Sequence, residues 1–446
     1  MKSSVLLLVL VLMTASGFAA CGGSSASPAP SDAGTTGDDG ATADAEMPDA
    51  ADETPPPIDH GKPSSTYPAF TPDMPELQNR GGAILSAPVI VPVTWDTDPD
   101  QTRLDTFTDQ IGATDYWKAI ATEYGVGVAT VGAHAHMPAS SIPASIDQIT
   151  LDGFVADSAG VPATSGWPAP TAQTVYILYL HPSTVLMANG ANACAQIGGY
   201  HTSTQVNGQQ VAYAIVPRCN RGTRTFDQTT ESASHELGEA VTDPHPLGGQ
   251  AYYGYDNDHV AWSLFQQSNV ENGDDCEFYQ DSNYMEKAPF AFSVQRQWSN
   301  KSAKAGHNPC VPLMAGAYFN VTPTALETVN VNARIGLVQV MTSKGINIPV
   351  GTSKTFPVGF YSDAASPAWS IRAAEAFNPL LPATTHNLTV SVDRTSAQNG
   401  EIAYVTVTVN KAGSTIGRST FAKLNFVTVL SSLNGTSHYM PILITN

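Results

Sequence analysis

Basic residues are scarce in this chain of 446 residues, which carries 20 Lys and Arg against 39 Asp and Glu. The formal net charge of −19 argues against nucleic acid as a partner, because nucleic acids are bound largely through cationic side chains. Long apolar runs are also missing, and after the N-terminus no segment is long and apolar enough for a transmembrane helix. Nine of the acids lie in residues 22–66, a stretch with almost no large aliphatic side chains. Such a composition predicts a disordered acidic tether over 21–66.

The N-terminus has the pattern of an export signal. Lys2 precedes the apolar run SVLLLVLVLM, and GFAAC places small residues directly before Cys21. This pattern predicts a signal peptide over 1–20. It is typical of a bacterial lipoprotein, in which Cys21 carries the lipid that anchors the chain to the outer membrane or cell surface. The alternative is plain cleavage after Ala20, which would leave Cys21 as a free thiol.

Cysteines are few, and four follow Cys21: Cys194, Cys219, Cys276 and Cys310. An even number in an exported chain predicts two disulfides. Three pairings are possible, and the simplest joins neighbours in the sequence, Cys194 to Cys219 and Cys276 to Cys310. No CxxC spacing occurs among these four residues, which disfavours a cysteine-based zinc site.

Hydrophobic patterning divides the rest of the chain in two. In 67–315 helical and strand patterns alternate, which predicts an α/β (or α+β) domain. APVIVPVTW (87–95) is typical of a strand buried on both faces, and 102–112, 115–125 and 144–160 are typical of helices. From 316 to 446 the pattern is one of alternating apolar and Thr, Ser or Asn residues between turns. This rhythm predicts an all-β sandwich of immunoglobulin type.

The segment SASHELGEAVTDPHP carries the clearest chemistry. It predicts a helix over 228–242 that ends before Pro244, with Asp227, Thr229 or Thr230 as its N-cap. An apolar stripe should face the core, formed by Ala233, Leu237, Ala240 and Val241.

His235 and Glu239 are four residues apart, so their side chains share another face of this helix. Two ligands one turn apart can hold one zinc ion, and the adjacent Glu236 can act as the general base, as in HExxH metalloenzymes. Here the pattern is HExxE, and the extra carboxylate also suits harder cations. The alternative is a solvated helix face with a weak i,i+4 pair.

Seven segments resemble a known family. In order they are GGAILSAPVIVPVTW, DYWKAIATEYGVG, CAQIGGYHTS, VAYAIVPRC, SHELGEAVTDP, ENGDDC and FSVQRQWSN. Together they resemble the exported bacterial HExxE zincin-like proteins related to the plant phosphate-induced (Exordium-like) family, over roughly 80–312. The resemblance implies a zincin-like metalloprotease-type domain in which the HExxE helix is the characteristic element.

The resemblance also implies a third ligand, an acidic residue well downstream of the helix. ENGDDC supplies Glu271 as the first choice and Asp274 as the second. His245 is a further alternative, because it lies ten residues after His235, the spacing of the third ligand in metzincins. Thr242 stands where the metzincin motif needs Gly, however, and Pro244 intervenes.

Three residues near these motifs are candidates for supporting roles. Asp243 is a candidate to orient His235 by a hydrogen bond. His201 and Tyr200, in GGYHTS, are candidates for substrate contact or transition-state stabilisation. The alternative for both is a buried structural role.

His134 and His136 are two positions apart on an expected strand, so their side chains share one face. This face either binds metal or is simply exposed to water. The acidic run at 256–258 suggests calcium but lacks the twelve-residue pattern of a calcium loop.

Three functions fit the sequence. The first is a cell-surface zinc-dependent hydrolase, and more narrowly a metallopeptidase acting on a polypeptide. The second is a non-enzymatic surface lipoprotein that binds cell-wall glycan or protein, with a structural metal or none. The third is a zincin-like scaffold that has lost its metal.

Overall fold

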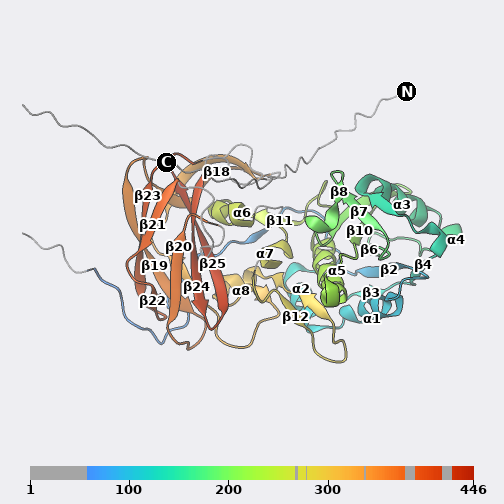
Figure 1. Cartoon of the computed structure of the whole chain (residues 1–446), viewed down its shortest axis with the longest axis horizontal. Coiled ribbons are helices and arrows are strands. Elements are labelled where there is room, and N and C mark those ends of the chain that lie inside the picture. The colour runs from blue at the N-terminus through green and yellow to red at the C-terminus, as the bar shows by residue number, and fades with distance from the viewer. Residues whose placement is uncertain (1–57, 267–269, 278, 336–337, 377–386, 414–423) are drawn as a thin grey trace, which may run out of the picture. The chain divides into compact units, whose positions relative to one another are not determined.

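A six-stranded sheet positions the HExxE helix (Figure 1). In this computed structural model the described residues are 58–266, 270–277, 279–335, 338–376, 387–413 and 424–446. The expected signal peptide, Cys21 and most of the expected tether therefore lie outside them. The sheet has the order β3-β2-β6-β10-β9, with β4 also paired to β2. Its strands are β2 (Val89–Trp95), β3 (Thr130–Val131), β4 (Ala135–Met137), β6 (Thr174–Tyr179), β9 (Tyr200–Val206) and β10 (Gln209–Val216).

All neighbours in this sheet are parallel except β9, which returns antiparallel to β10 at one edge. The turn between them is Asn207-Gly208, and both residues have positive φ, as a tight hairpin turn requires. The edge strand β9 therefore has its register fixed by a two-residue turn.

Both faces of the sheet are covered. One face packs against α1 (Gln101–Ile111), α2 (Asp115–Tyr124) and α5 (Thr225–Thr242), and the opposite face packs against α3 (Gln148–Gly160). Strand β2 contributes Ile90 to the first core and Val91 and Val93 to the second. The prediction that 87–95 is a strand buried on both faces is confirmed.

The helices predicted at 102–112 and 115–125 are confirmed as α1 and α2, and Gly125 ends α2 in the left-handed conformation. The single helix predicted over 144–160 is wrong in its first turn. Residues Ser145–Asp147 form the short strand β5, and α3 begins after them. The Asp147 side chain accepts a hydrogen bond from Thr150 N at 2.8 Å, so it caps the helix and favours its start at 148.

Short elements complete this part of the chain. They are β1 (Leu77–Asn79), α4 (Pro162–Ser165), β7 (Val185–Ala188), β8 (Ala191–Asn192), β11 (Tyr252–Tyr255), α6 (Val260–Gln266), α7 (Asp274–Glu277), β12 (Asn283–Met285), β13 (Ser293–Gln295), β14 (Gln297–Trp298), α8 (Asn300–Ala305) and β15 (Cys310–Val311). Helix α5 packs against β13 as well as against the sheet, so the segment after α7 forms a second wall along the helix.

From Phe319 onward the described residues contain strands and no helix. One sheet has the order β16-β19-β23-β21 and the other β17-β18-β25-β24-β20-β22. Apolar residues of both sheets share one core, among them Val405, Val407, Val427 and Ile442. The strands are β16 (Phe319–Pro323), β17 (Glu327–Ile335), β18 (Val338–Asn347), β19 (Ser353–Ser362), β20 (Trp369–Ala374), β21 (Leu388–Val392), β22 (Ser396–Ala397), β23 (Ile402–Val409), β24 (Asn425–Leu433) and β25 (Thr436–Thr445).

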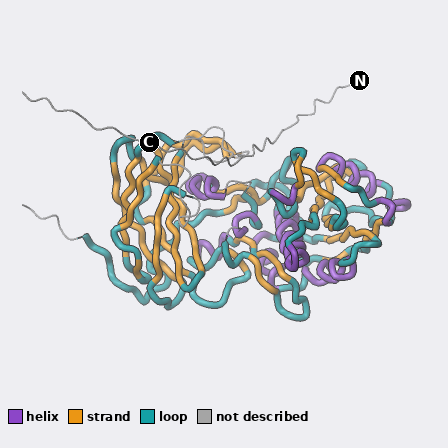
Figure 2. The backbone as a smooth tube through the Cα atoms, in the orientation of Figure 1, coloured by secondary structure: helices purple, strands orange, loops and turns teal. Residues whose placement is uncertain are grey.

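The chain is thus mixed α/β with more strand than helix, as the tube in Figure 2 shows. Residues His60–Asn446 belong to one compact unit. Residues 60–66, which the sequence placed at the end of the tether, are hydrogen-bonded to the all-β part. Ile402 N donates to His60 O at 2.8 Å, and Asn399 Nδ2 donates to Ser64 O and Thr66 O at 2.9 Å.

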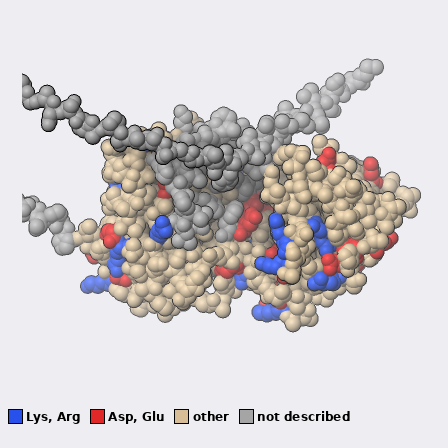
Figure 3. Space-filling view, in the orientation of Figure 1, with Lys and Arg blue, Asp and Glu red and all other residues tan. Residues whose placement is uncertain are grey.

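Both disulfides join neighbours in the sequence, as predicted: Cys194 with Cys219, and Cys276 with Cys310. Two disulfides are typical of an exported protein. Among the described helices, none has the length and apolar character needed to cross a membrane. On the face seen in Figure 3, uncharged residues predominate and charged side chains are scattered among them.

Candidate metal centre

Helix α5 carries the centre of the site. It spans Thr225–Thr242 and stops before Asp243-Pro244, as predicted. Its predicted apolar stripe is confirmed, since Ala233, Leu237, Ala240 and Val241 are all buried in the core under the sheet.

The predicted N-cap of α5 is wrong, because the helix begins earlier than expected. Its N-cap is Arg224, which makes no capping side-chain bond. Thr229 and Thr230 lie inside the helix and donate their hydroxyls to the carbonyls of Thr225 and Asp227. A Thr hydroxyl inside a helix can also bond to a carbonyl three or four residues back, so the presence of these residues in the sequence did not define the cap.

His235, Glu239 and Asp274 form one group that can hold a metal ion. His235 Nε2 lies 3.1 Å from Glu239 Oε1 and 3.8 Å from Asp274 Oδ1. Zinc bonds of about 2.0–2.1 Å in a tetrahedron would place ligand atoms about 3.3 Å apart. The spacing of these three atoms therefore fits one zinc-sized cation.

His201, Glu236 and Glu239 form a second group on the other side of Glu239. His201 lies on β9, and its Nδ1 is 3.6 Å from Glu236 Oε2 and 3.4 Å from Glu239 Oε2. Glu239 thus turns one carboxylate oxygen toward His235 and the other toward His201. The sequence did not identify His201 as part of a metal cluster, because it lies 34 positions before His235 and on a different element.

The first-choice third ligand, Glu271, lies with His201 and not with His235. Its Oε1 is 3.4 Å from His201 Nε2, while the second choice, Asp274, joins His235 and Glu239. A short turn at Asn272-Gly273 separates the two acids and directs them to different histidines. Both predicted acids therefore lie beside the cluster, and Asp274, not Glu271, shares a group with His235 and Glu239.

Gly273 lets the chain pass very close to the helix. A Cβ atom at Gly273 would lie 2.7 Å from Glu239 Oε1 and 3.0 Å from His235 Nδ1. On the other side, a Cβ at Gly199 would lie 2.8 Å from Glu236 Oε1. Both glycines therefore permit backbone to cover the acidic face of α5, which explains their place in the two motifs.

Gln295, not Asp243, contacts the far side of the His235 ring. Gln295 Nε2 lies 2.8 Å from His235 Nδ1 and donates to Gly273 O at 2.9 Å. The predicted role of Asp243 is wrong. Its Oδ1 accepts a hydrogen bond from Ala251 N at 2.8 Å, because the chain turns away from α5 after Thr242. Asp243 contacts the site through its backbone carbonyl, 3.1 Å from His201 Nε2.

Tyr200 and His245 lie outside the cluster. Side chains alternate along a strand, so Tyr200 points away from its neighbour His201 and packs on the opposite face, beside Tyr213. His245 belongs to none of the metal-binding groups found among the described residues. The helix ends at Thr242 and Pro244 follows, which carries the chain away from the ligand face of α5.

The histidines and carboxylates of the cluster shift one another's pKa values. Burial would lower the pKa of His201, but Glu271, Glu236 and Glu239 raise it well above the usual value. Burial likewise opposes the charge on His235, and Glu239 raises the pKa of that imidazole. Burial raises the pKa of Glu271 to about 7, although His201 opposes the shift.

The carboxylates of α5 differ in the direction of their shifts. Burial raises the pKa of Glu236, and the two histidines only partly oppose this. Burial would also raise the pKa of Glu239, but His235 and His201 lie on its two sides and lower it below the usual range. Glu239 is therefore the more anionic of the two, and Glu236 the better proton acceptor.

In the acidic run at 256–258, Asp256 is bonded to groups of the protein itself. The carboxylate of Asp256 already accepts hydrogen bonds from Glu76 N at 2.9 Å and Asp258 N at 3.0 Å, and it pairs with His259 Nδ1 at 2.7 Å. The metal-binding groups found in the described part of the chain do not include Asp256.

Comparison with known proteins adds no identity to this site: no family model matches the sequence, and no curated protein matches it.

Proposed function

We propose that this protein is a zinc-dependent hydrolase of the cell surface, with a zincin-like domain and, more narrowly, metallopeptidase activity. One observation carries the proposal: His235, Glu239 and Asp274 bring three ligand atoms within 4.8 Å of one another. Glu236 follows His235 directly on the same helix. The resemblance of the seven segments to exported HExxE proteins supports the same conclusion, as do the two disulfides.

The residues present fit zinc. Zinc takes imidazole and carboxylate ligands, and a catalytic site leaves a position free beyond three protein ligands. When bound, the ion would polarise a substrate carbonyl and lower the pKa of a water molecule. For Nε2 of His235 to be a ligand, its proton must lie on Nδ1. Gln295 would then present its Oε1 there, which a 180° rotation of the amide allows at the cost of its bond to Gly273.

Glu236 has the properties of a general base. Its pKa is raised by burial, so it accepts a proton more readily than an exposed glutamate. It would take a proton from water and later return it to the leaving amine. His201, 3.6 Å from Glu236, is a positioning residue that holds the carboxylate in place.

The burial of the cluster favours a second candidate function. The side chains of His201, Glu236 and Glu239 are only 3%, 6% and 4% exposed. A closed site is typical of structural metal. In this case the protein is a non-enzymatic surface lipoprotein that binds glycan or protein, and the metal only stabilises it. Both candidates include the lipid anchor at Cys21, which the signal pattern supports.

Metal content is the first test. Elemental mass spectrometry on the exported chain should find zinc in the wild type and one zinc ion fewer per chain in His235→Ala and Glu239→Ala. His181→Ala is the matched control, because His181 is only half-buried and contacts Ser183 outside the cluster. Absence of metal from wild type supplied with zinc would refute both candidates in their metal-bound form.

Activity separates the two candidates. Peptide hydrolysis by the wild type that disappears in Glu236→Gln, with zinc retained, identifies the enzyme. Zinc bound tightly by a protein that cleaves no peptide in a broad library identifies the structural site.

A further inference from the structure

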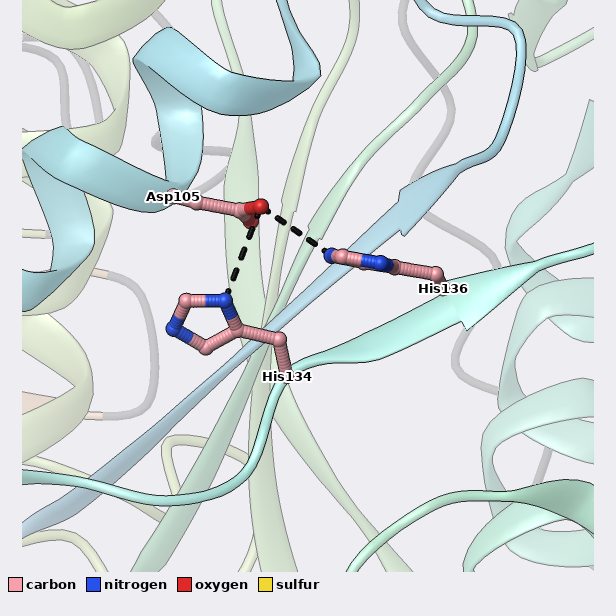
Figure 4. A group of neighbouring side chains, drawn as sticks. All are labelled: Asp105, His134 and His136. Atoms are coloured by element: carbon pink, nitrogen blue, oxygen red, sulfur yellow. Dashed lines mark hydrogen bonds and ion pairs between the residues drawn. The ribbon is translucent and has the colours of Figure 1, made fainter.

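A second group of potential metal ligands lies on the same face of the sheet, on other elements (Figure 4). Asp105 projects from α1, His136 from β4, and His134 from the residues just before β4. None of these three residues belongs to the α5 cluster. The two histidines are two positions apart on an extended segment, so they face the helix together.

The three ligand atoms converge on one point. Asp105 Oδ2 lies 3.0 Å from His136 Nε2 and 3.5 Å from His134 Nδ1, and the three atoms lie within 4.8 Å of one another. These distances bracket the separation of about 3.3 Å that neighbouring ligands have around a tetrahedral zinc ion. Figure 4 shows both rings turned toward the same carboxylate.

Asp109 holds the other side of the His134 ring. It lies one helical turn after Asp105 on α1, and its Oδ1 is 2.8 Å from His134 Nε2. A metal-binding histidine commonly donates its second N–H to a carboxylate in this way, which leaves the other nitrogen free for the ion. This contact gives His134 the orientation of a ligand through Nδ1.

We propose that Asp105, His134 and His136 bind a divalent transition-metal ion of the zinc or copper class, independently of the α5 centre. Two imidazoles and one carboxylate favour such ions over calcium or magnesium. The side chains are 13%, 27% and 39% exposed, so an ion can reach the site from solvent. Water or a ligand from outside the chain completes the coordination. Bound metal would join α1 to β4 and stabilise this edge of the sheet.

The competing explanation is a plain network of polar contacts, in which the two histidines pair with Asp105 and Asp109 and hold no ion. The two explanations predict different effects of added metal on the stability of the protein. A metal site binds an ion in competition with protons and gains stability from it. A plain network of polar contacts gains nothing from metal.

Electron paramagnetic resonance with Cu²⁺ as the probe tests the proposal. Titration of a Glu239→Ala chain, in which the α5 centre is disabled, should give one bound Cu²⁺ coupled to two imidazole nitrogens. His136→Ala in the same background should reduce the coupling to one nitrogen and weaken binding at least tenfold. Asp109→Asn should weaken binding about 10- to 100-fold while both nitrogens remain. His181→Ala in the same background is the control. It should change neither the number of coupled nitrogens nor the affinity for Cu²⁺.

A Cu²⁺ spectrum that His136→Ala leaves unchanged in a folded protein would overturn the proposal. So would the absence of bound Cu²⁺ in the Glu239→Ala chain. Neither result bears on the hydrolase, which depends on other residues. Conversely, an empty α5 centre in wild type would not affect this site.

Discussion

Replacement of Gly273 by Ala is a sharp test of how the α5 centre is built. The new methyl group would lie 2.7 Å from Glu239 Oε1 and 3.0 Å from His235 Nδ1, closer than carbon and these atoms approach without strain. Neither neighbour can move freely. Glu239 Oε1 accepts a hydrogen bond from Asp274 N at 3.0 Å, and His235 Nδ1 contacts Gln295 at 2.8 Å.

Overpacking of this kind costs about 1–3 kcal/mol. Because the strain falls on two proposed ligands, we expect the loss to appear in metal affinity as well as in stability. If binding takes the whole cost, the dissociation constant for zinc rises about 5- to 150-fold. Isothermal titration with Zn²⁺ measures the affinity, and urea unfolding of the metal-free protein measures stability.

Gly153→Ala is the matched control. Gly153 lies in helix α3, has no atom within 4 Å of an added Cβ, and is remote from α5 in the sheet packing. Alanine there should stabilise the helix by about 0.5–1 kcal/mol and leave zinc affinity unchanged. Wild-type affinity and stability in Gly273→Ala would refute the arrangement of His235, Glu239 and the 271–275 segment.

Three further predictions follow from particular contacts. Asp274→Asn should hold one zinc ion fewer per chain than wild type while His201→Gln keeps the full number, measured by elemental mass spectrometry; the reverse result would assign the ion to the group around His201. The carboxylates beside His259 overcome its burial and raise its pKa from 6.5 to about 9, so its contribution of about 3 kcal/mol should be complete below pH 6.5 and lost as the pH rises through 9. Urea unfolding at pH 6.5 and 9.5 should show this loss in wild type and much less of it in His259→Gln, and equal slopes with pH would contradict it. The disulfide between Cys276 and Cys310 closes a loop with a sequence separation of 34, so serine at both positions should cost roughly 4 kcal/mol in the chain-entropy model, measured by urea unfolding; an unchanged unfolding midpoint would show that packing alone holds α7.

The two candidate sites differ in how their electrostatics are arranged. In the α5 cluster, the carboxylates face the buried His201 and the half-buried His235, and the pKa of Asp274 is raised by burial and by Glu239. A divalent cation would relieve this mutual repulsion directly. At Asp105 the groups are partly wet, so water screens their charges and a cation gains less. We therefore expect the α5 centre to bind zinc more tightly than the site at His134 and His136.

Local pattern was sufficient for the elements that carry the centre. Apolar spacing predicted the buried strand β2. The positions of Gly and Pro predicted where helices α1, α2 and α5 end. These signals act over a few residues, because helix termination and strand burial depend on neighbouring side chains. The face shared by His235 and Glu239 also followed from helical geometry alone.

The partners of that helix face were decided by tertiary structure. His201 reaches it because β9 pairs antiparallel with β10 at the sheet edge, and Gln295 reaches it because β13 packs along α5. Glu271 and Asp274 are only three residues apart, yet they meet different histidines. Sequence spacing determines which side chains lie one turn apart on a helix. Contacts between elements depend instead on sheet order, register and the close approach that glycines permit, and here only the folded chain shows them.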